Sequence, residues 1–182
     1  MKTERVELRN FFNALNAVLL VCLGWMVLYF SNELPDKIPV HFGLDGTPDG
    51  WAGKGDLMNI LALVLGVNAL FYLIIIAIPW LRKHPALLNI PHKDRFLALP
   101  LEKQRVYWDL LKEFMAGIAV SVNILFLTAI WGTIRVGLGE AEKLPAGSIW
   151  PGLILMLVVI VIYTARLIMM PKKLIKAGEL QR

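Results

Sequence analysis

The sequence predicts an all-α, polytopic membrane protein with four transmembrane helices, a structured outer loop and an interfacial cytoplasmic helix. Hydrophobic residues make up 57% of the 182 residues and charged residues only 18%, against about 45–50% and about 25% in soluble domains. The apolar residues also gather in blocks of about 20, the length that crosses a hydrocarbon layer of ~30 Å. We therefore expect residues 1–182 to form a single four-helix membrane domain.

The first two apolar blocks predict the first two spans. Residues 11–30 contain no charged side chain, and they are longer than the apolar core of a signal peptide, about 7–15 residues. The block ends in Tyr29-Phe30-Ser31-Asn32, which is a poor cleavage site, so we expect a retained helix. The second span is expected at residues 57–81, where Trp80 is typical of the membrane interface.

A polar segment, residues 82–112, separates these spans from the rest of the chain. Pro85, Pro91 and Pro100 prevent a long helix in its first part. Residues 101–114 then bring apolar side chains to one helical face, opposite charged ones. This pattern predicts an amphipathic helix that lies along the cytoplasmic interface and continues into the third span.

The last two apolar blocks predict the third and fourth spans, at about residues 114–134 and 149–170. Trp150-Pro151 opens the fourth block, where a proline is tolerated. Pro171 and the lysines that follow it are expected to end the fourth helix.

The distribution of lysine and arginine predicts the orientation. Fifteen of the 19 lie before the first span, in residues 82–112 or at the C-terminal end, and four lie in the two other connections. Short segments rich in these residues stay in the cytoplasm, so we expect both termini inside and the loop 31–56 outside. The formal charge of +5 does not indicate a nucleic-acid partner, because the cations flank apolar blocks, a pattern that favours lipid contact.

The spans contain few polar side chains, and we expect these to hydrogen-bond between helices, with a substrate contact as the alternative. They are Asn16, Asn68, Ser121, Asn123 and Thr128. Glycines within the spans are expected to permit close helix approach; these are Gly24, Gly66, Gly117 and Gly132. No Asp, Glu, Lys or His is expected at mid-depth, which argues against a proton-coupled transporter.

Common catalytic spacings are missing from the sequence, so we expect no enzyme activity and no cofactor. His41, His84 and His92 have no His-Glu-x-x-His spacing, and they are expected on opposite faces of the membrane. Cys22 lies in the apolar first span, where a thiolate is disfavoured. No nucleophile elbow or Walker-type loop occurs.

The loop 34–56 holds three prolines, five glycines and four aspartates. Oxygen-bearing side chains fall at positions 1, 3, 5 and 12 of a calcium-loop spacing, with glycine at 6; they are Asp45, Thr47, Asp49 and Asp56. The same residues are equally expected in a turn-rich cap without metal. Both interpretations remain open from the sequence.

Individual loop residues also have expected roles. Prolines on either side of Asp36 hold the chain extended as it leaves the first helix. Trp51 is expected at the level of the lipid headgroups, and Lys54 is expected to pair with Asp36, Asp49 or lipid phosphate. His41 is expected to titrate near neutrality if it is exposed.

The loop motif resembles that of a bacterial membrane domain, domain of unknown function 1648, over about residues 15–75. The residues that carry the resemblance are Pro35, Asp36, Pro39, His41, Gly46, Asp49, Trp51 and Lys54. That domain is also found at the N-terminus of SdpI-type proteins, which are multi-span immunity and signalling proteins against a secreted peptide toxin. The resemblance implies a bacterial cytoplasmic (inner) membrane. SdpI-type chains carry further spans, and residues 89–100 match no pattern of theirs.

These observations lead to three functional hypotheses. The first is a non-enzymatic membrane protein that binds or senses a ligand or peptide at the outer leaflet, related to SdpI-type immunity or signalling. The second is a metal-dependent activity of the outer loop, with Asp45, Asp49 and Asp56 as ligands. The third is a small accessory subunit that docks through its cytoplasmic segment. The bilayer is the expected partner in each case, and the oligomeric state stays open.

Overall fold

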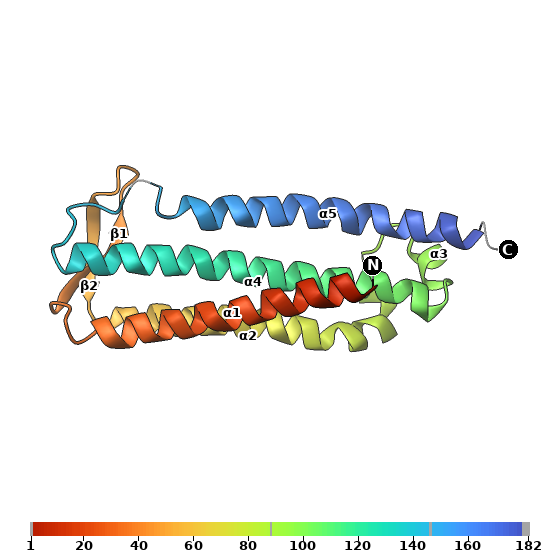
Figure 1. Ribbon diagram of the computed structural model, residues 1–182, viewed down its shortest axis with the longest axis horizontal. Helices are drawn as coiled ribbons and strands as arrows, with labels where there is room; N and C mark the ends of the chain where they lie inside the picture. Colours follow the sequence, from red (N-terminus) through yellow and green to blue (C-terminus); the bar gives the residue numbers. More distant parts are fainter. Residues whose placement is uncertain (1, 88, 146, 180–182) are drawn as a thin grey trace.

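Four long helices run side by side, and a two-stranded β-hairpin lies at one end of them (Figure 1). The computed structural model describes residues 2–87, 89–145 and 147–179. In chain order the elements are α1 (Lys2–Phe30), β1 (Lys37–Phe42), β2 (Pro48–Gly53), α2 (Asp56–Lys83), the 3₁₀ turn η1 (Pro85–Leu87), α3 (Lys93–Leu97), α4 (Leu101–Gly137) and α5 (Trp150–Glu179). The start of α1, the end of α5 and α3 all lie at the end opposite the hairpin (Figure 1).

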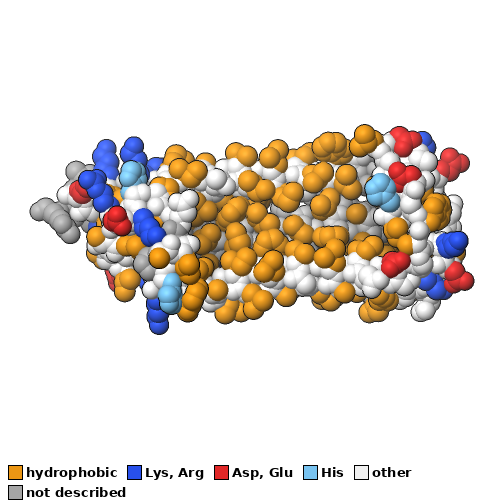
Figure 2. Space-filling view, turned by 180° about the vertical axis from the view of Figure 1, so that it is seen from behind, with side chains coloured by type: hydrophobic (Ala, Val, Ile, Leu, Met, Phe, Trp, Pro, Cys, Tyr) orange, Lys and Arg blue, Asp and Glu red, His pale blue; other side chains and the backbone are white. Residues whose placement is uncertain are grey.

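All four long helices have the length and composition of membrane spans. Figure 2 shows a broad apolar band around the middle of the molecule, with the charged side chains gathered at its two ends. The four expected spans are therefore confirmed as helices of a multi-pass membrane protein, each extending beyond its predicted bounds. Which end faces the cytoplasm stays a prediction, and Arg182, one of the cations counted for it, lies outside the described residues.

The central helix is α4. It packs against α5 on one side and against α1 and α2 on the other, and it also contacts β1 (Figure 1). Leu23 and Val27 of α1, Ile38 of β1 and Ile130 and Ile134 of α4 belong to one buried cluster near the hairpin. At the opposite end, a second cluster joins α3, α4 and α5; it includes Phe96, Tyr107, Trp108 and Ile175.

The expected helical bundle is confirmed, but the loop 31–56 contains a two-stranded β-hairpin that the all-α expectation did not include. β1 and β2 pair antiparallel, with Pro39 opposite Trp51 and Phe42 opposite Pro48, and the register is irregular between Pro39 and His41. The short apolar alternation of β1 has a strand period, but its prolines and the glycines of β2 disguise it as a loop. The β-branched Ile38 is fully buried under the hairpin.

The predicted interfacial helix does not form a separate element. Residues 101–114 are the first part of α4, which runs without interruption for 37 residues, about 55 Å at 1.5 Å per residue. No proline or glycine occurs between Leu101 and Ala116 to break it. On the predicted apolar stripe, Leu110 is buried, and Leu111 and Phe114 pack against buried clusters, so these side chains face protein where a membrane interface was expected.

Pro171 does not end the fourth helix, since α5 continues to Glu179. A proline inside a helix leaves the carbonyl four residues earlier without its usual partner. Here Pro171 is buried, and Leu174 and Ile175 pack into the cluster around Phe96. Burial of these apolar side chains offsets the lost hydrogen bond and holds the last turns of α5 in place.

Candidate functional site

The hairpin brings the motif residues into one small structure. Pro39 and His41 lie on β1, Asp49 and Trp51 lie on β2, and Gly46 lies in the turn between the strands. Asp36 and Lys54 lie just outside the two strand ends, where Lys54 Nζ is 3.3 Å from Asp36 Oδ1. The backbone N–H of Lys54 also donates to the Asp36 carbonyl oxygen at 3.0 Å. Of the three partners expected for Lys54, the structure shows Asp36.

His41 and Asp49 face each other across the hairpin, with His41 Nδ1 against Asp49 Oδ1. Gly50 pairs with His41 in the strand register, and a Cβ at Gly50 would lie 2.7 Å from His41 Cβ. A glycine is therefore needed here for the histidine to reach its carboxylate. His41 and Asp49 stand out in the sequence as motif residues, but neither their contact nor the part of Gly50 was expected from it.

The turn of the hairpin is fastened to the connection between α4 and α5. Asp45 Oδ1 accepts the backbone N–H of Thr47 at 3.1 Å, and Lys143 Nζ is 3.2 Å from Asp45 Oδ2. Gly46 adopts φ +80, and its carbonyl oxygen accepts the N–H of Leu144 at 2.9 Å. A Cβ at Gly46 would lie 2.5 Å from the Leu144 carbonyl oxygen, so this contact requires glycine.

The four residues of the calcium spacing do not converge on one point. Asp45 is engaged by Thr47 and Lys143, Asp49 lies against His41, and Asp56 Oδ1 accepts from Asn59 Nδ2 at 2.8 Å at the start of α2. Within residues 2–87, 89–145 and 147–179, no three His, Cys, Asp or Glu side chains are grouped as metal ligands would be. The positions of these four side chains fit the interpretation of the loop as a turn-rich cap without metal.

The turn holds the Asp45 carboxylate in its charged form. Donation from the Thr47 hydroxyl, then from the Thr47 N–H, and then the nearby Lys143 lower the pKa of Asp45 from 3.8 to about 2. A lowered pKa stabilises the fold above pH 3.8, and this contribution is lost as the pH falls towards 2.

We expect Thr47→Val to raise the Asp45 pKa towards 3.8 by more than Lys143→Gln does, because the Thr47 hydroxyl has the larger effect. Carbon-13 NMR titration of the Asp45 carboxyl measures both shifts. Thr47→Ser keeps the hydroxyl and is the matched control. A larger shift in Lys143→Gln would contradict this order of causes.

The hairpin carries exposed apolar side chains. Trp51 is 58% exposed on β2, Val40 is exposed on β1, and Leu44 in the turn is fully exposed. Their polar neighbours are already paired, as His41 is with Asp49. The hairpin therefore exposes three apolar side chains while its turn is held by the connection between α4 and α5.

Three asparagines form a buried hydrogen-bonded cluster between α1, α2 and α4. Asn16 Nδ2 donates to Asn68 Oδ1 at 3.0 Å, Asn68 Nδ2 donates to Asn123 Oδ1 at 2.8 Å, and Asn123 Nδ2 donates to Asn16 and Asn68. The expected interhelical hydrogen bonds are confirmed for these residues. The same expectation is wrong for Ser121 and Thr128, because their hydroxyls donate to carbonyls of their own helix.

Of the expected glycine contacts, one joins two helices. A Cβ at Gly117 of α4 would lie 3.2 Å from Val159 of α5, whereas nothing lies within 4 Å of one at Gly24 or Gly66. Gly132 faces Leu144 of the connecting segment instead of a helix. Gly152 of α5, which was not among the expected glycines, comes closest of the glycines to the backbone of another helix, at Leu125 of α4.

A buried carboxyl lies between α4 and α5. Glu113 is 2% exposed, and its Oε1 accepts a hydrogen bond from the Tyr163 hydroxyl; its Oε2 has no partner among the described residues. The Arg166 guanidinium lies over the Tyr163 ring at 5.7 Å. Glu113 directly precedes the predicted third span and Tyr163 lies in the predicted fourth span, so this hydrogen bond joins the two helices next to the predicted spans.

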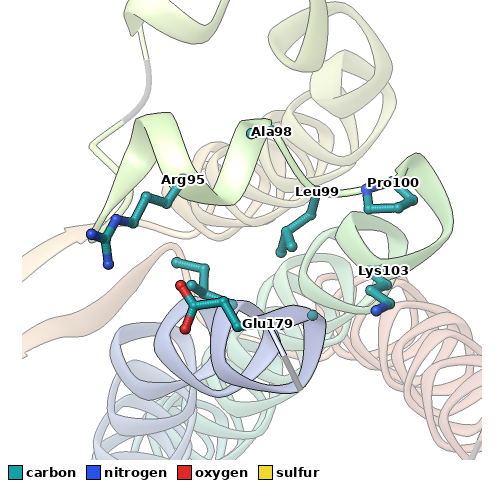
Figure 3. A pocket seen from close by; sticks show the side chains of 8 residues that line it. Arg95, Ala98, Leu99, Pro100, Lys103 and Glu179 are labelled. Carbon is teal, nitrogen blue, oxygen red and sulfur yellow. The ribbon is translucent and has the colours of Figure 1, made fainter. Parts of the chain in front are cut away.

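The end opposite the hairpin is basic and hollowed. Two adjoining cavities lie there, one of about 410 Å³ between α3, α4 and α5 and one of about 340 Å³ between α3 and α5. In the larger one, Arg95 from α3, Lys103 from α4 and Glu179 from α5 surround the opening (Figure 3). His92, at the start of α3 with φ 54, lines the smaller cavity. His92 is thus at the opposite end of the molecule from His41, as expected (Figure 1).

Comparison with known proteins supports the resemblance seen in the loop. Residues 17–66 match the family model described as Domain of unknown function (DUF1648), and this range contains the whole hairpin and every motif residue. An uncharacterized protein from Archaeoglobus fulgidus is 28% identical over 96 residues, 52% of this chain and 52% of the relative. The chain thus spans about half the length of that relative. No solved structure matches the chain.

Proposed function

We propose that this chain, whose residues 17–66 carry the domain of unknown function, is a non-enzymatic multi-pass membrane protein that binds a peptide or protein partner through its hairpin. The finer proposal is a role in immunity or signalling of the SdpI type, with a peptide as ligand. One observation carries it: the hairpin exposes Trp51, Val40 and Leu44 while the turn below them is fixed to the bundle.

A fixed surface suits binding, because a partner then orders little of the protein when it docks. The hairpin is held by the Leu144 N–H on Gly46, by Lys143 on Asp45, and by burial of Ile38. Exposed tryptophan is also the residue type most enriched among side chains that dominate protein interfaces. Trp51 is therefore the side chain expected to anchor a partner.

The proposed orientation puts the hairpin outside and both chain ends in the cytoplasm. Its support is the excess of lysine and arginine at the end that carries the helix termini and α3. A partner that reaches the hairpin would then come from the outer side or from the outer leaflet. The bacterial cytoplasmic membrane belongs to this proposal on the ground of the loop resemblance.

The test is a deletion strain challenged with peptide toxins and complemented with variants. Complementation by Trp51→Ala is expected to fail, and by His41→Ala to be weakened, because loss of His41 leaves Asp49 without its cross-strand contact. Trp150→Ala is the matched control, since Trp150 is also 58% exposed and begins α5 at the hairpin end, outside residues 17–66.

A photo-crosslinking residue at position 51, with the same residue at position 150 as control, separates a partner from lipid. A protein or peptide adduct at position 51 alone supports the proposal. Lipid adducts alone at both positions would instead assign Trp51 to the headgroup region. Equal protection by wild type, Trp51→Ala and an empty vector would refute the immunity role.

A further inference from the structure

A third cavity, of about 260 Å³, lies at the basic end between α1, α2 and α4. Its lining comes from three helices that are far apart in the sequence. The residues are Arg9 of α1, Ile78, Pro79 and Arg82 of α2, and Arg105, Trp108, Asp109 and Lys112 of α4. Four cationic side chains thus share one cavity with a single carboxylate.

That carboxylate is already engaged by two of the cations. Arg9 Nη1 lies 3.4 Å and Lys112 Nζ lies 4.0 Å from Asp109 Oδ1. Arg82 and Arg105 have no carboxylate partner within the part of the chain that the structure describes. The cavity therefore keeps an excess of positive charge on two arginines from facing helices.

One residue of the lining, Trp108, also has a buried hydrogen-bond donor without a partner. Trp108 is 2% exposed, and its indole Nε1–H has no acceptor among the described residues. A buried donor without an acceptor costs about 1–3 kcal/mol. The arginine N–H groups of the lining are donors only and carry positive charge, so the complementary ligand is rich in acceptors and negatively charged.

We propose that this cavity binds a phosphate group, either that of an anionic lipid or that of a small free phosphate compound. Arginine binds phosphate oxygens through two parallel N–H donors, and basic pockets between transmembrane helices bind anionic headgroups. Ile78 and Pro79 form an apolar part of the lining, suited to the glycerol backbone of a lipid. The two neighbouring cavities differ, because Glu179 lines both of them and opposes an anion (Figure 3).

The test measures binding to the full chain in detergent and in vesicles. The probes are inorganic phosphate, glycerol 3-phosphate, phosphatidylglycerol mixed with equal parts of phosphatidylcholine, and phosphatidylcholine alone. Native mass spectrometry and the shift of the unfolding temperature report binding. Phosphatidylglycerol binding alone assigns the site to lipid, and binding of the small phosphates too assigns it to the phosphate group as such.

Arg82→Gln and Arg105→Gln are each expected to weaken probe binding about tenfold, because each removes charged hydrogen bonds. Lys83→Gln and Lys173→Gln are the matched controls: both lysines are exposed and neither lines this cavity. These variants remove the same charge and are expected to bind like wild type. An equal loss of probe binding in the controls would show that general surface charge causes the effect, and would overturn the proposal.

Asp109→Asn gives a result that poor folding cannot imitate. It removes the carboxylate that Arg9 and Lys112 engage, so both cations become free for the ligand. Probe binding is expected to tighten severalfold, since a like charge leaves the cavity. Binding that is unchanged or weaker in this variant, or the absence of binding of every probe to wild type, overturns the proposed site.

Discussion

Gly152→Ala is expected to separate α5 from α4 and to destabilise the protein by about 3 kcal/mol, the upper part of the range for overpacking. A Cβ at Gly152 would lie 2.6 Å from the backbone nitrogen of Leu125 and 2.7 Å from its Cα and Cβ. Backbone atoms cannot rotate away, so the two helices must shift. Because α5 packs mainly on α4, the shift would disturb much of its packing.

Gly66→Ala is the control for this substitution. Nothing lies within 4 Å of a Cβ at Gly66, and alanine is a better helix former by about 1 kcal/mol in water. We expect this variant to be as stable as wild type or more so. Unfolding in mixed detergent micelles measures both, and equal stabilities would show that the helices do not meet as closely at Gly152.

Asn123→Leu is the second substitution with a large expected effect, a loss of about 2 kcal/mol. It removes three hydrogen bonds between helices, each worth about 0.6 kcal/mol on average in a membrane. It also leaves Asn16 Oδ1 without its donor in a buried position. The contact of α4 with α1 and α2 would loosen at the middle of the bundle.

Ser121→Ala tests whether burial alone explains the loss. Ser121 is as buried as Asn123 and lies on the same helix, but its hydroxyl donates to the Gly117 carbonyl of that helix. We expect less than about 0.5 kcal/mol from this change. The same unfolding assay compares the two variants. Similar losses in both would argue against the asparagine cluster as a link between helices.

The four spans could be predicted from the sequence because an apolar block of about 20 residues has few alternatives in a chain of this composition. The asparagine contacts could be predicted as well, since buried amides need partners. The hairpin could not. Pro39 and Pro48 lie in its strands and Gly50 and Gly53 replace side chains there, so the strand alternation is nearly invisible.

The course of α4 shows another limit of sequence analysis. An amphipathic stripe such as that of residues 101–114 looks the same whether it faces lipid headgroups or other helices. Here Trp108 meets Phe96, and Glu113 meets Tyr163. Both partners are identified only by tertiary packing. The tight approach at Gly152 and the basic cavity likewise depend on segments that are distant in the sequence.

The contacts of the hairpin with Lys143 and Leu144 set the order in which this part of the protein is completed during synthesis. The hairpin is made early in synthesis, and its strands and the Asp36–Lys54 pair need nothing made later. Its contacts with Lys143 and Leu144 become available only when α4 and the connection to α5 have been synthesised, because a chain is completed from its N-terminus. The surface of the hairpin is therefore completed only after α4 and the connection to α5 have been made.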